Sequence, residues 1–381
     1  MQKITALILI LSLLVGCGAS SSVPTEVVPS PPQVEEAGPG ENPLAPQISA
    51  SSAILIEAST GQILYEKNAR ERAYPASITK IMTALLAIES GDVKRNVSVA
   101  DEAVGTEGSS IYLQQGEVLS MEDLLYGMML RSGNDAAIAA AVSAAGSVSD
   151  FVDRMNLRAE ELGALDTHFM NPSGLHHKDH YTTAYDMALI ARETMKNPVF
   201  REIAGAENWT ASRGGEAPYN FFENKNKVIF QYEGGNGIKL GYTTIAGRTL
   251  VASSCRDGME VICVVLNDPN WFEDSYALMD YAHENWEMVK VLEGECPLLA
   301  RPLKGGTKSQ VFLGLSGAIS VPVRKGEAPE IELQYDLPQT LHAPVCRWQE
   351  SGSLVVFSLG ERVLTAPLYF LEDIPGQKKE E

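Results

Sequence analysis

The sequence contains little cysteine, few aromatic residues and no apolar run long enough to cross a membrane as a helix. Five cysteines in 381 residues argue against a disulfide-dense scaffold. Basic residues are also outnumbered, 30 against 49 acidic ones, which gives a formal charge of −19. This charge argues against a nucleic-acid-binding protein and against docking on anionic lipid, and it favours solubility alone.

The first residues are typical of an export signal. Lys3 precedes an apolar or small run over residues 4–16, which is too short for a membrane span and suits a signal peptide. The run ends in Leu14-Val15-Gly16-Cys17, which resembles the lipobox of bacterial lipoproteins. We expect cleavage after residue 16, lipidation of Cys17 and an extracytoplasmic protein that is lipid-anchored to the bacterial cell membrane. An ordinary signal peptide with a chance cysteine is the alternative.

Composition divides the rest of the chain. Residues 17–48 are rich in Pro, Ser, Gly and Glu and predict a disordered tether behind the lipidated cysteine. Residues 49–290 alternate between strand-like and helical patterns, residues 291–375 read as short strands, and residues 376–381 form a polar tail. We therefore expect one mixed domain followed by a small all-β domain that resembles a β-sandwich.

The mixed domain begins and ends with hairpins. Residues 53–57 and 62–66 are β-prone runs around a turn, and residues 249–255 and 260–266 flank Asp257-Gly258, with Lys239–Tyr242 leading into that second hairpin. Helices are expected from Ser77 onward and over residues 120–130, 135–145, 183–195 and 278–288. This order predicts a three-layer α/β (α+β) domain, in which helices flank an antiparallel sheet completed by both ends of the domain.

A two-residue turn at Asp257-Gly258 would place Cys255 opposite Glu260 and Cys263 opposite Ala252. The two cysteines would then not pair with each other. We expect them, with Cys296 and Cys346, to be buried free thiols.

Ser77-Ile78-Thr79-Lys80 opens an amphipathic helix directly after Pro75-Ala76. Spacing of Ser-x-x-Lys places both side chains on one helix face, one turn apart. The serine oxygen lies near the positive end of the helix dipole, and a buried lysine can lose its charge and act as a general base. The pattern therefore suits a serine nucleophile that needs no histidine.

Two further motifs follow in order. Ser132-Gly133-Asn134 interrupts two helical patterns, where a tight turn can direct Ser132 and Asn134 into a cleft. Lys239-Leu240-Gly241 opens a strand, where the lysine supplies positive charge and the glycine lets a ligand lie against the backbone. Each motif alone is more often a polar loop or a surface lysine, so the interpretation depends on the three occurring together.

Together the motifs match the S-x-x-K, S-D-N and K-T-G set of penicillin-binding proteins and class A β-lactamases. The flanking sequence resembles the low-molecular-weight D-alanyl-D-alanine carboxypeptidases, serine peptidase family S11, over residues 53–286, and the trailing β domain also fits that family. The matching stretches are YPASITKIMTA (74–84), GSSI (108–111), LLYG (124–127), SGNDA (132–136), NPSGL (171–175), TTA (182–184), NGIK (236–239) and GYT (241–243).

The resemblance implies a two-step acyl transfer that removes the terminal D-alanine from peptidoglycan stem peptides ending in D-Ala-D-Ala, and so a role in the cell wall. Ser77 would be the nucleophile, Lys80 the general base and Ser132 the proton relay.

The resemblance also assigns the binding groups. Asn134, Gly241 and Thr243 would bind substrate, Lys239 would bind the terminal carboxylate, and the backbone N–H groups of Ser77 and Tyr242 would form the oxyanion hole. β-Lactams would acylate Ser77, and neither a metal nor an organic cofactor is implied.

Leu240 departs from the family pattern, because a threonine hydroxyl there would also bind the carboxylate. The loss of such a hydrogen bond costs about 1.5–3 kcal/mol. Thr243 or Thr244 could substitute for it. A β-lactam sensor or wall-binding protein with little turnover is therefore the main alternative.

A class A β-lactamase is less favoured, because no E-x-x-L-N stretch lies between the second and third motifs. The cluster from His176 to His180 is a further candidate metal site, but its spacing favours a solvated loop.

Overall fold

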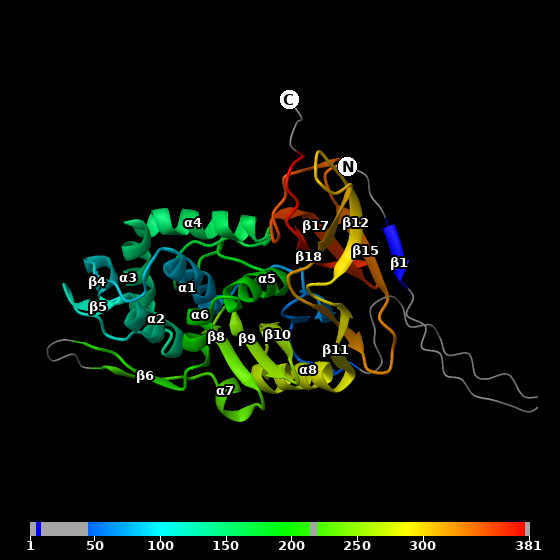
Figure 1. Ribbon diagram of the computed structural model, residues 1–381. Coiled ribbons are helices and arrows are strands. Elements are labelled where there is room, and N and C mark those ends of the chain that lie inside the picture. The colour runs from blue at the N-terminus through cyan, green and yellow to red at the C-terminus, as the bar shows by residue number, and fades with distance from the viewer. Residues whose placement is uncertain (1–4, 9–44, 214–218, 378–381) are drawn as a thin grey trace, which may run out of the picture. The chain divides into compact units, whose positions relative to one another are not determined.

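The computed structural model of the chain describes residues 5–8, 45–213 and 219–377. It divides into two compact units, Pro46–Met288 and a second unit that joins Met1–Ala45 to Val289–Glu381. Figure 1 shows both, with the sheet and helices of the larger unit in blue to yellow and the strands of the smaller unit in yellow to red, apart from the blue strand near its N-terminus. Cys17 and residues 18–44 of the predicted tether lie outside the described residues.

The larger unit contains these elements. Its helices are η1 (Ala76–Thr79), α1 (Lys80–Glu89), η2 (Asp101–Ala103), α2 (Met121–Leu130), α3 (Asn134–Ala145), α4 (Val148–Glu161), α5 (Ala184–Met195), α6 (Pro198–Gly205), α7 (Val228–Gln231) and α8 (Trp271–Asn285). Its strands are β2 (Ser52–Glu57), β3 (Ile63–Lys67), β4 (Asn96–Ser98), β5 (Val118–Ser120), β6 (Asn208–Thr210), β7 (Phe221–Glu223), β8 (Gly235–Thr243), β9 (Gly247–Arg256) and β10 (Met259–Leu266).

The central sheet is antiparallel in the order β3-β2-β10-β9-β8. Both expected hairpins are present, and the sheet joins the first strands of the unit to its last ones, as predicted. Asp257 and Gly258 adopt positive φ angles of 49° and 78°, which suits a tight two-residue turn. The register places Cys255 opposite Glu260 and Cys263 opposite Ala252, as expected. Residues 239–242 lie within β8, an edge strand of its own, rather than only leading into β9.

Helices cover the sheet from both sides. Figure 1 shows α8 below strands β8–β10, with α5 and α6 above them, so the unit has the expected three layers. The helix expected at 278–288 begins earlier, at Trp271, where Glu273 and Asp274 favour its positive end. It ends at Asn285, and residues 286–288 belong to the strand β11 (Trp286–Leu292).

The remaining helices form an apolar core around the Ala-rich α3. The side chain of Ser120 accepts a hydrogen bond from the backbone N–H of Asp123 and so begins α2, as the capping pattern predicted. α4 was not expected, although Ser147 caps it in the same way. Small alanine side chains let α3 pack closely against its neighbours, which include α1, α2 and α4. This packing fixes the turn between α2 and α3 that carries the second motif.

The smaller unit is all-β, as predicted. Its strands are β12 (Pro297–Lys304), β13 (Gln310–Gly314), β14 (Ile319–Arg324), β15 (Ile331–Asp336), β16 (Leu341–His342), β17 (Glu350–Ser358) and β18 (Glu361–Phe370). A seven-stranded sheet runs β1-β15-β17-β18-β13-β12-β16, and β11 pairs with β14 in a second sheet. The strand β1 (Thr5–Ile8) lies within the predicted signal segment and pairs antiparallel with β15.

The cysteines correct one expectation. All four described cysteines are free thiols, but only Cys263 is buried, while Cys255, Cys296 and Cys346 are exposed. Cys255 lies at the hairpin end of β9, and Cys296 and Cys346 lie in connections between strands, where the chain runs at the surface.

Within residues 5–8, 45–213 and 219–377, no single helix is long and apolar enough to cross a bilayer. The α3–α4 pair would meet that requirement only as two helices bent by 85°.

Candidate active site

The first motif lies at the start of α1. Ser77 is on the short 3-10 helix η1, and Lys80 is the first residue of the α-helix that continues from it. Ser77 is half-buried, whereas Lys80 has no exposed surface. The expected helix is therefore present, but its first turn is tighter than an α-helix. The serine is therefore partly accessible, whereas the lysine beside it is enclosed.

The Lys80 ammonium nitrogen has three oxygen neighbours. Its Nζ lies 3.1 Å from Ser77 Oγ, 2.7 Å from Asn134 Oδ1 and 2.5 Å from the backbone carbonyl oxygen of Ser173. Burial lowers the pKa of Lys80 well below its ordinary value, and the nearby charge of Lys239 lowers it further. The motif therefore holds a lysine that loses its proton easily next to the serine hydroxyl.

The hydrogen-bonding capacity of a neutral lysine matches these neighbours. The carbonyl of Ser173 and the amide oxygen of Asn134 can only accept hydrogen bonds, so they take the two N–H groups of a neutral amine. The remaining lone pair then faces Ser77, whose hydroxyl can donate to it. A neutral Lys80 in this arrangement would be able to accept the serine proton, and its role as general base remains a prediction.

The loop at residues 171–175 holds the lysine in place. Asn171 Oδ1 accepts backbone hydrogen bonds from Ser173, Gly174 and Leu175, which fixes the loop. Gly174 has φ of +83°, and a Cβ atom there would lie 1.9 Å from the carbonyl oxygen of Ala76. Only glycine permits so close an approach of this loop to the residue before the nucleophile.

The second motif contributes an amide and a hydroxyl from the α2–α3 turn. Asn134 donates from Nδ2 to the Glu107 carbonyl at 2.6 Å while its oxygen receives Lys80, so it retains one free N–H for a substrate. Ser132 is buried and has a positive φ of 64°. Its hydroxyl makes no hydrogen bond within residues 45–213 and 219–377, so its role as proton relay remains a prediction.

The third motif lies on β8, directly beside the nucleophile. A Cβ atom on Gly241 would lie 2.7 Å from the Ser77 backbone nitrogen and 2.6 Å from Thr249 Oγ1, so the position requires glycine. Thr249 Oγ1 donates to the Pro75 carbonyl at 2.8 Å and ties β9 to the start of η1. The structure thereby brings together the first and third motifs.

Lys239 is 2% exposed and donates from Nζ to the carbonyl of Leu240 at 2.9 Å. Burial lowers the pKa of Lys239 to about 7, with a further contribution from the positive charge of Lys225. Leu240 is half-buried and offers only a hydrocarbon side chain. Near neutral pH, the charge of Lys239 is therefore sensitive to any anion that binds beside it.

The end of β8 carries Tyr242 and Thr243. The Tyr242 ring is 61% exposed, and its backbone follows the glycine that contacts Ser77. Thr243 Oγ1 accepts a hydrogen bond from the Ala246 N–H at 3.0 Å and so closes the β8–β9 turn. The binding of substrate by Thr243 and the contribution of the Tyr242 N–H to an oxyanion hole remain predictions.

Sequence reasoning missed Lys225, which lies before α7. Partial desolvation and the Arg131 guanidinium lower the pKa of Lys225. Lys225 therefore lies near both Lys239 and Arg131. Among the described residues it has neither a hydrogen bond nor an ion pair. No pattern in the sequence marks it, because its position depends on the fold.

His180 corrects the prediction of a solvated loop. His176, Lys178 and Asp179 are exposed, but His180 is buried, and desolvation lowers its pKa to about 3. Its Nδ1 accepts from the Met170 N–H at 3.3 Å, so its Nε2 carries the proton and donates to Thr79 Oγ1 at 2.9 Å. His180 is thus a buried residue that hydrogen-bonds to Thr79 of the first motif.

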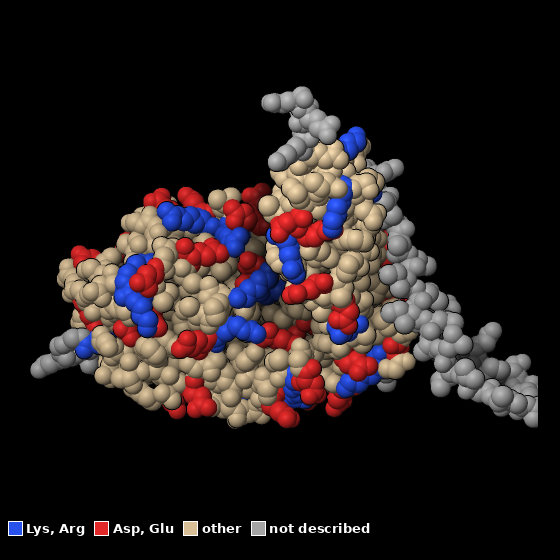
Figure 2. All heavy atoms as spheres, in the orientation of Figure 1, with Lys and Arg blue, Asp and Glu red and all other residues tan. Residues whose placement is uncertain are grey.

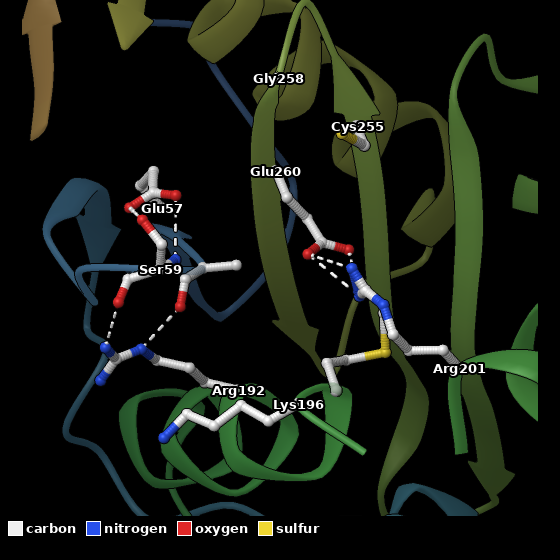
Figure 3. A pocket seen from close by; sticks show the side chains of 10 residues that line it. Glu57, Ser59, Arg192, Lys196, Arg201, Cys255, Gly258 and Glu260 are labelled. Atoms are coloured by element: carbon white, nitrogen blue, oxygen red, sulfur yellow. Dashed lines mark hydrogen bonds and ion pairs between the residues drawn. The ribbon is translucent and has the colours of Figure 1, made fainter. Parts of the chain in front are cut away.

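Away from the three motifs, charged side chains of the larger unit form ion pairs and hydrogen bonds within the protein. Within the described residues, no group of three or more His, Cys, Asp or Glu side chains is placed to hold a metal ion. Figure 2 shows acidic and basic side chains interspersed over the visible surface. A cavity of about 450 Å³ is lined by residues outside the three motifs. In it, Arg201 and Glu260 form a bidentate pair (Figure 3). Arg192 donates there to the backbone carbonyls of Ala58 and Ser59.

Comparisons with known proteins agree with this geometry. The profile of the D-alanyl-D-alanine carboxypeptidases, peptidase S11, matches residues 40–270, and that of the C-terminal domain of penicillin-binding protein 5 matches residues 286–376. The chain is 34% identical to the D-alanyl-D-alanine carboxypeptidase DacF of Bacillus subtilis, over 85% of this chain and 86% of that protein. It is 31% identical to the D-alanyl-D-alanine carboxypeptidase DacC of Escherichia coli, over 87% of this chain and 85% of that protein.

Solved structures give the same result. Penicillin-binding protein 5 from Haemophilus influenzae superposes with a TM-score of 0.71 at 29% identity, covering 87% of this chain and 98% of that one. PBP3 from Streptococcus pneumoniae, described as a peptidoglycan synthesis regulatory factor, gives a TM-score of 0.72 at 26% identity, over 86% of this chain and all of that one. Both similarities extend well beyond the larger unit.

Proposed function

The chain belongs to the D-alanyl-D-alanine carboxypeptidase family, peptidase S11, and we propose that it removes the terminal D-alanine from peptidoglycan stem peptides through an acyl-enzyme on Ser77. The observation that carries this proposal is the surroundings of Lys80 Nζ, which lies 3.1 Å from Ser77 Oγ while two pure acceptors occupy its other directions. That arrangement suits a neutral lysine acting as base toward a serine. A histidine is not needed for this chemistry.

Acylation begins when Ser77 Oγ attacks the carbonyl between the two D-alanines and its proton passes to Lys80. The backbone N–H groups of Ser77 and Tyr242 stabilise the resulting oxyanion, since both lie where β8 meets η1. The C–N bond then breaks, and the leaving amine takes up a proton through Ser132. Asn134 uses its free N–H to hold the substrate backbone.

Deacylation needs only water. A water molecule attacks the acyl-enzyme, releases the shortened stem peptide and restores the Ser77 hydroxyl, with Lys80 again handling the proton. A β-lactam mimics the D-Ala-D-Ala end and acylates the same oxygen. Its ester persists because no additional deacylating carboxylate serves it in this mechanism. Slow penicillin hydrolysis is therefore expected rather than rapid turnover.

Lys239 and Lys225 together receive the terminal carboxylate of the substrate. Lys239 is the third-motif lysine, and Lys225 is the exposed cation whose charge lowers its pKa. Two neighbouring cations without a carboxylate partner between them favour an anion at that point. This arrangement supplies positive charge where Leu240 lacks the hydroxyl group of the usual motif.

A paired assay tests the proposed activity. Wild-type protein is incubated with diacyl-Lys-D-Ala-D-Ala and, separately, with a fluorescent penicillin, and the Ser77→Ala variant is treated in the same way. We expect D-alanine release and labelling from the wild type and neither from the variant. Labelling without D-alanine release would support the alternative of a β-lactam sensor. Penicillin turnover at many per second would support a β-lactamase.

The protein is also proposed to be a lipoprotein anchored through Cys17, because small residues precede that cysteine at the end of a short apolar run. Two or more acyl chains give stable anchoring. Expression with a radiolabelled fatty acid tests this proposal, with Cys17→Ser as the comparison. Label in the membrane fraction of the wild type alone is expected. Equal release of both proteins into the medium would contradict lipid anchoring.

A further inference from the structure

A second cavity adjoins the third motif. It has a volume of about 510 Å³, and its wall includes Leu240, Trp271 and Phe272 together with three cations, Lys225, Lys227 and Arg248. Glu273 is its acidic lining residue. The cavity therefore combines an apolar wall with an excess of positive charge, in a protein whose formal charge is −19.

The cavity shares Lys225 with the proposed carboxylate site and adjoins Lys239 through Leu240. In the proposed function, the terminal carboxylate binds at Lys239 and Lys225, and that carboxylate departs with the amine. Lys225 lines the cavity, as does Leu240, the residue that follows Lys239. A leaving residue with a longer side chain than alanine would extend from the carboxylate into this space.

Of the cavity cations, Lys225 and Lys227 make no side-chain hydrogen bond among the described residues, whereas Arg248 donates from one Nη to the Pro269 carbonyl at 2.6 Å. Arg248 lies over the Trp271 ring at 5.8 Å and Lys227 over the Phe272 ring at 5.6 Å, so aromatic faces orient both. Among the described residues, none of the three cations is in an ion pair. The cavity of Figure 3 differs, because Arg201 is neutralised there by Glu260.

We propose that this cavity is a leaving-group subsite, and that the protein cleaves D-alanyl bonds to residues that are larger than alanine and carry a second negative charge. The inference rests on the proposed function and names a substrate class for the same site. The aliphatic part of such a residue would contact Leu240 and Trp271, and its second carboxylate would lie near Lys227 and Arg248.

The reaction is the same acyl transfer. Ser77 Oγ bonds to the D-alanyl carbonyl carbon as the C–N bond to the larger residue breaks, and the released amine takes the proton. Water then hydrolyses the ester. Two sources supply this chemistry: a single stem peptide that ends in an anionic D-amino acid, or a second stem peptide joined through a cross-link whose amine belongs to a diamino diacid and is therefore adjacent to a carboxylate.

Synthetic peptides of the form diacyl-Lys-D-Ala-D-Xaa test the subsite, with D-Ala, D-Glu, D-Gln or D-Lys as the leaving residue. D-Glu and D-Gln have the same shape, so the ratio of their kcat/KM values isolates charge. One exposed ion pair predicts a preference for D-Glu of about fivefold. Lys227→Glu and Arg248→Glu should each bring this ratio to one or below.

Lys290→Glu is the matched control, because Lys290 is an exposed lysine on β11 and not a lining residue of the cavity. It should keep the D-Glu preference of the wild type. A ratio of one or less in the wild type, with normal D-alanine release from the D-Ala peptide, would overturn the subsite and leave the proposed function intact. Failure to release any leaving residue would overturn the proposed function itself.

A purified cross-linked peptide dimer separates the two sources. Cleavage to monomers that depends on Ser77 and falls in Arg248→Glu would identify the neighbouring stem peptide as the natural occupant. Cleavage of the D-Glu peptide without cleavage of the dimer would assign the subsite to single stems that end in an anionic residue.

Discussion

Lys80 Nζ lies 2.5 Å from the backbone carbonyl oxygen of Ser173, a residue 93 positions further along the chain. Lys80, the proposed general base, is thus held by a loop outside its own helix, and a backbone carbonyl, unlike a side chain, cannot be removed by substitution. The position of the loop can be changed, however, because the neighbouring Gly174 lies against the carbonyl of Ala76. A substitution at Gly174 can therefore be used to shift the loop that holds Lys80.

Gly174→Ala should move the base and slow acylation. The added Cβ would lie 1.9 Å from the Ala76 carbonyl oxygen, so the loop or η1 must shift. A displacement of about 1 Å near reacting atoms can cost about 100-fold in rate. We expect a decrease of that order in the second-order rate of labelling by fluorescent penicillin, measured by stopped reaction and gel fluorescence.

Gly116→Ala is the matched control for that substitution. Its φ of +69° imposes a similar left-handed strain, but a Cβ there meets nothing within 4 Å. Both variants should lose stability through backbone strain, about 1–2 kcal/mol. Equal labelling rates in the two variants would show that the contact with Ala76 does not set the position of the base.

The pH dependence of kcat/KM should be bell-shaped for a peptide with a free terminal carboxylate. Lys80 must be neutral to accept a proton, so the rate rises with pH through its lowered pKa. Lys239 must be charged to bind the carboxylate, so the rate decreases as pH rises through its pKa of about 7. A substrate that ends in an amide should lack the decrease. The same alkaline decrease for both substrates would contradict the assignment to Lys239.

Lys225→Met should move the alkaline limb to higher pH. The positive charge of Lys225 lowers the pKa of Lys239, so its removal raises that pKa. KM for the free-carboxylate peptide should rise at the same time, because one of the two cations is lost. Initial rates across a pH series give both quantities. An unchanged alkaline limb would show that Lys225 does not act on Lys239.

Leu240→Thr should improve recognition of the carboxylate. The added hydroxyl can donate a hydrogen bond to a charged group, which is worth about 1.5–3 kcal/mol, or a factor of about 10 to 150 in kcat/KM. Leu240→Val is the control, since valine has the shape of threonine without the hydroxyl. Equal kcat/KM values in the two variants would mean that Lys225 already provides what the hydroxyl would add.

Arg213 and Glu117 form a buried pair whose loss should destabilise the larger unit. Their side chains are 0% and 8% exposed, with Arg213 Nε 2.7 Å from Glu117 Oε1. Arg213→Met would leave a buried carboxylate and cost about 3–5 kcal/mol. Denaturant unfolding measures this loss. The double variant Arg213→Met with Glu117→Met should recover much of it, and no recovery would indicate that the carbonyl contacts of Arg213 matter more.

The stability from that pair should also depend on pH. Burial, the largest single effect, raises the pKa of Glu117, but the hydrogen bonds from Arg213 and from the Gln114 backbone N–H, together with the charge of Arg213, more than offset it, and the pKa lies below its ordinary value of 4.5. The stabilisation is therefore present above pH 4.5 and lost as pH falls through the lowered pKa. The difference between wild type and Arg213→Met should decrease below about pH 4, the range of carboxylate titration.

Local patterns in the sequence were sufficient to predict the parts of the fold that depend on neighbouring residues. The Asp257-Gly258 turn determined the register of its hairpin, so the partners of Cys255 and Cys263 were predicted correctly. Ser120 capped α2 as expected, because its contact is with a residue nearby in sequence. Each of the three motifs could be recognised for the same reason, because its residues are adjacent in the sequence.

Contacts between distant segments could not be predicted in this way. The importance of Lys225 comes from its proximity to Arg131 and Lys239, which approach it only after folding. His180 was placed in a solvated loop because its neighbours are polar, yet it is buried against Thr79.

The tie between Thr249 and Pro75 spans 174 positions of the chain. Ser77 therefore acquires its neighbours on β8 and β9 only after the C-terminal part of the larger unit has been synthesised and has docked. A chain that stops short of β8 would contain Ser77 and Lys80 but would lack Tyr242, whose N–H is proposed to complete the oxyanion hole. Penicillin labelling should then count completed molecules, so the same reagent that reports catalysis also serves as an assay of folding.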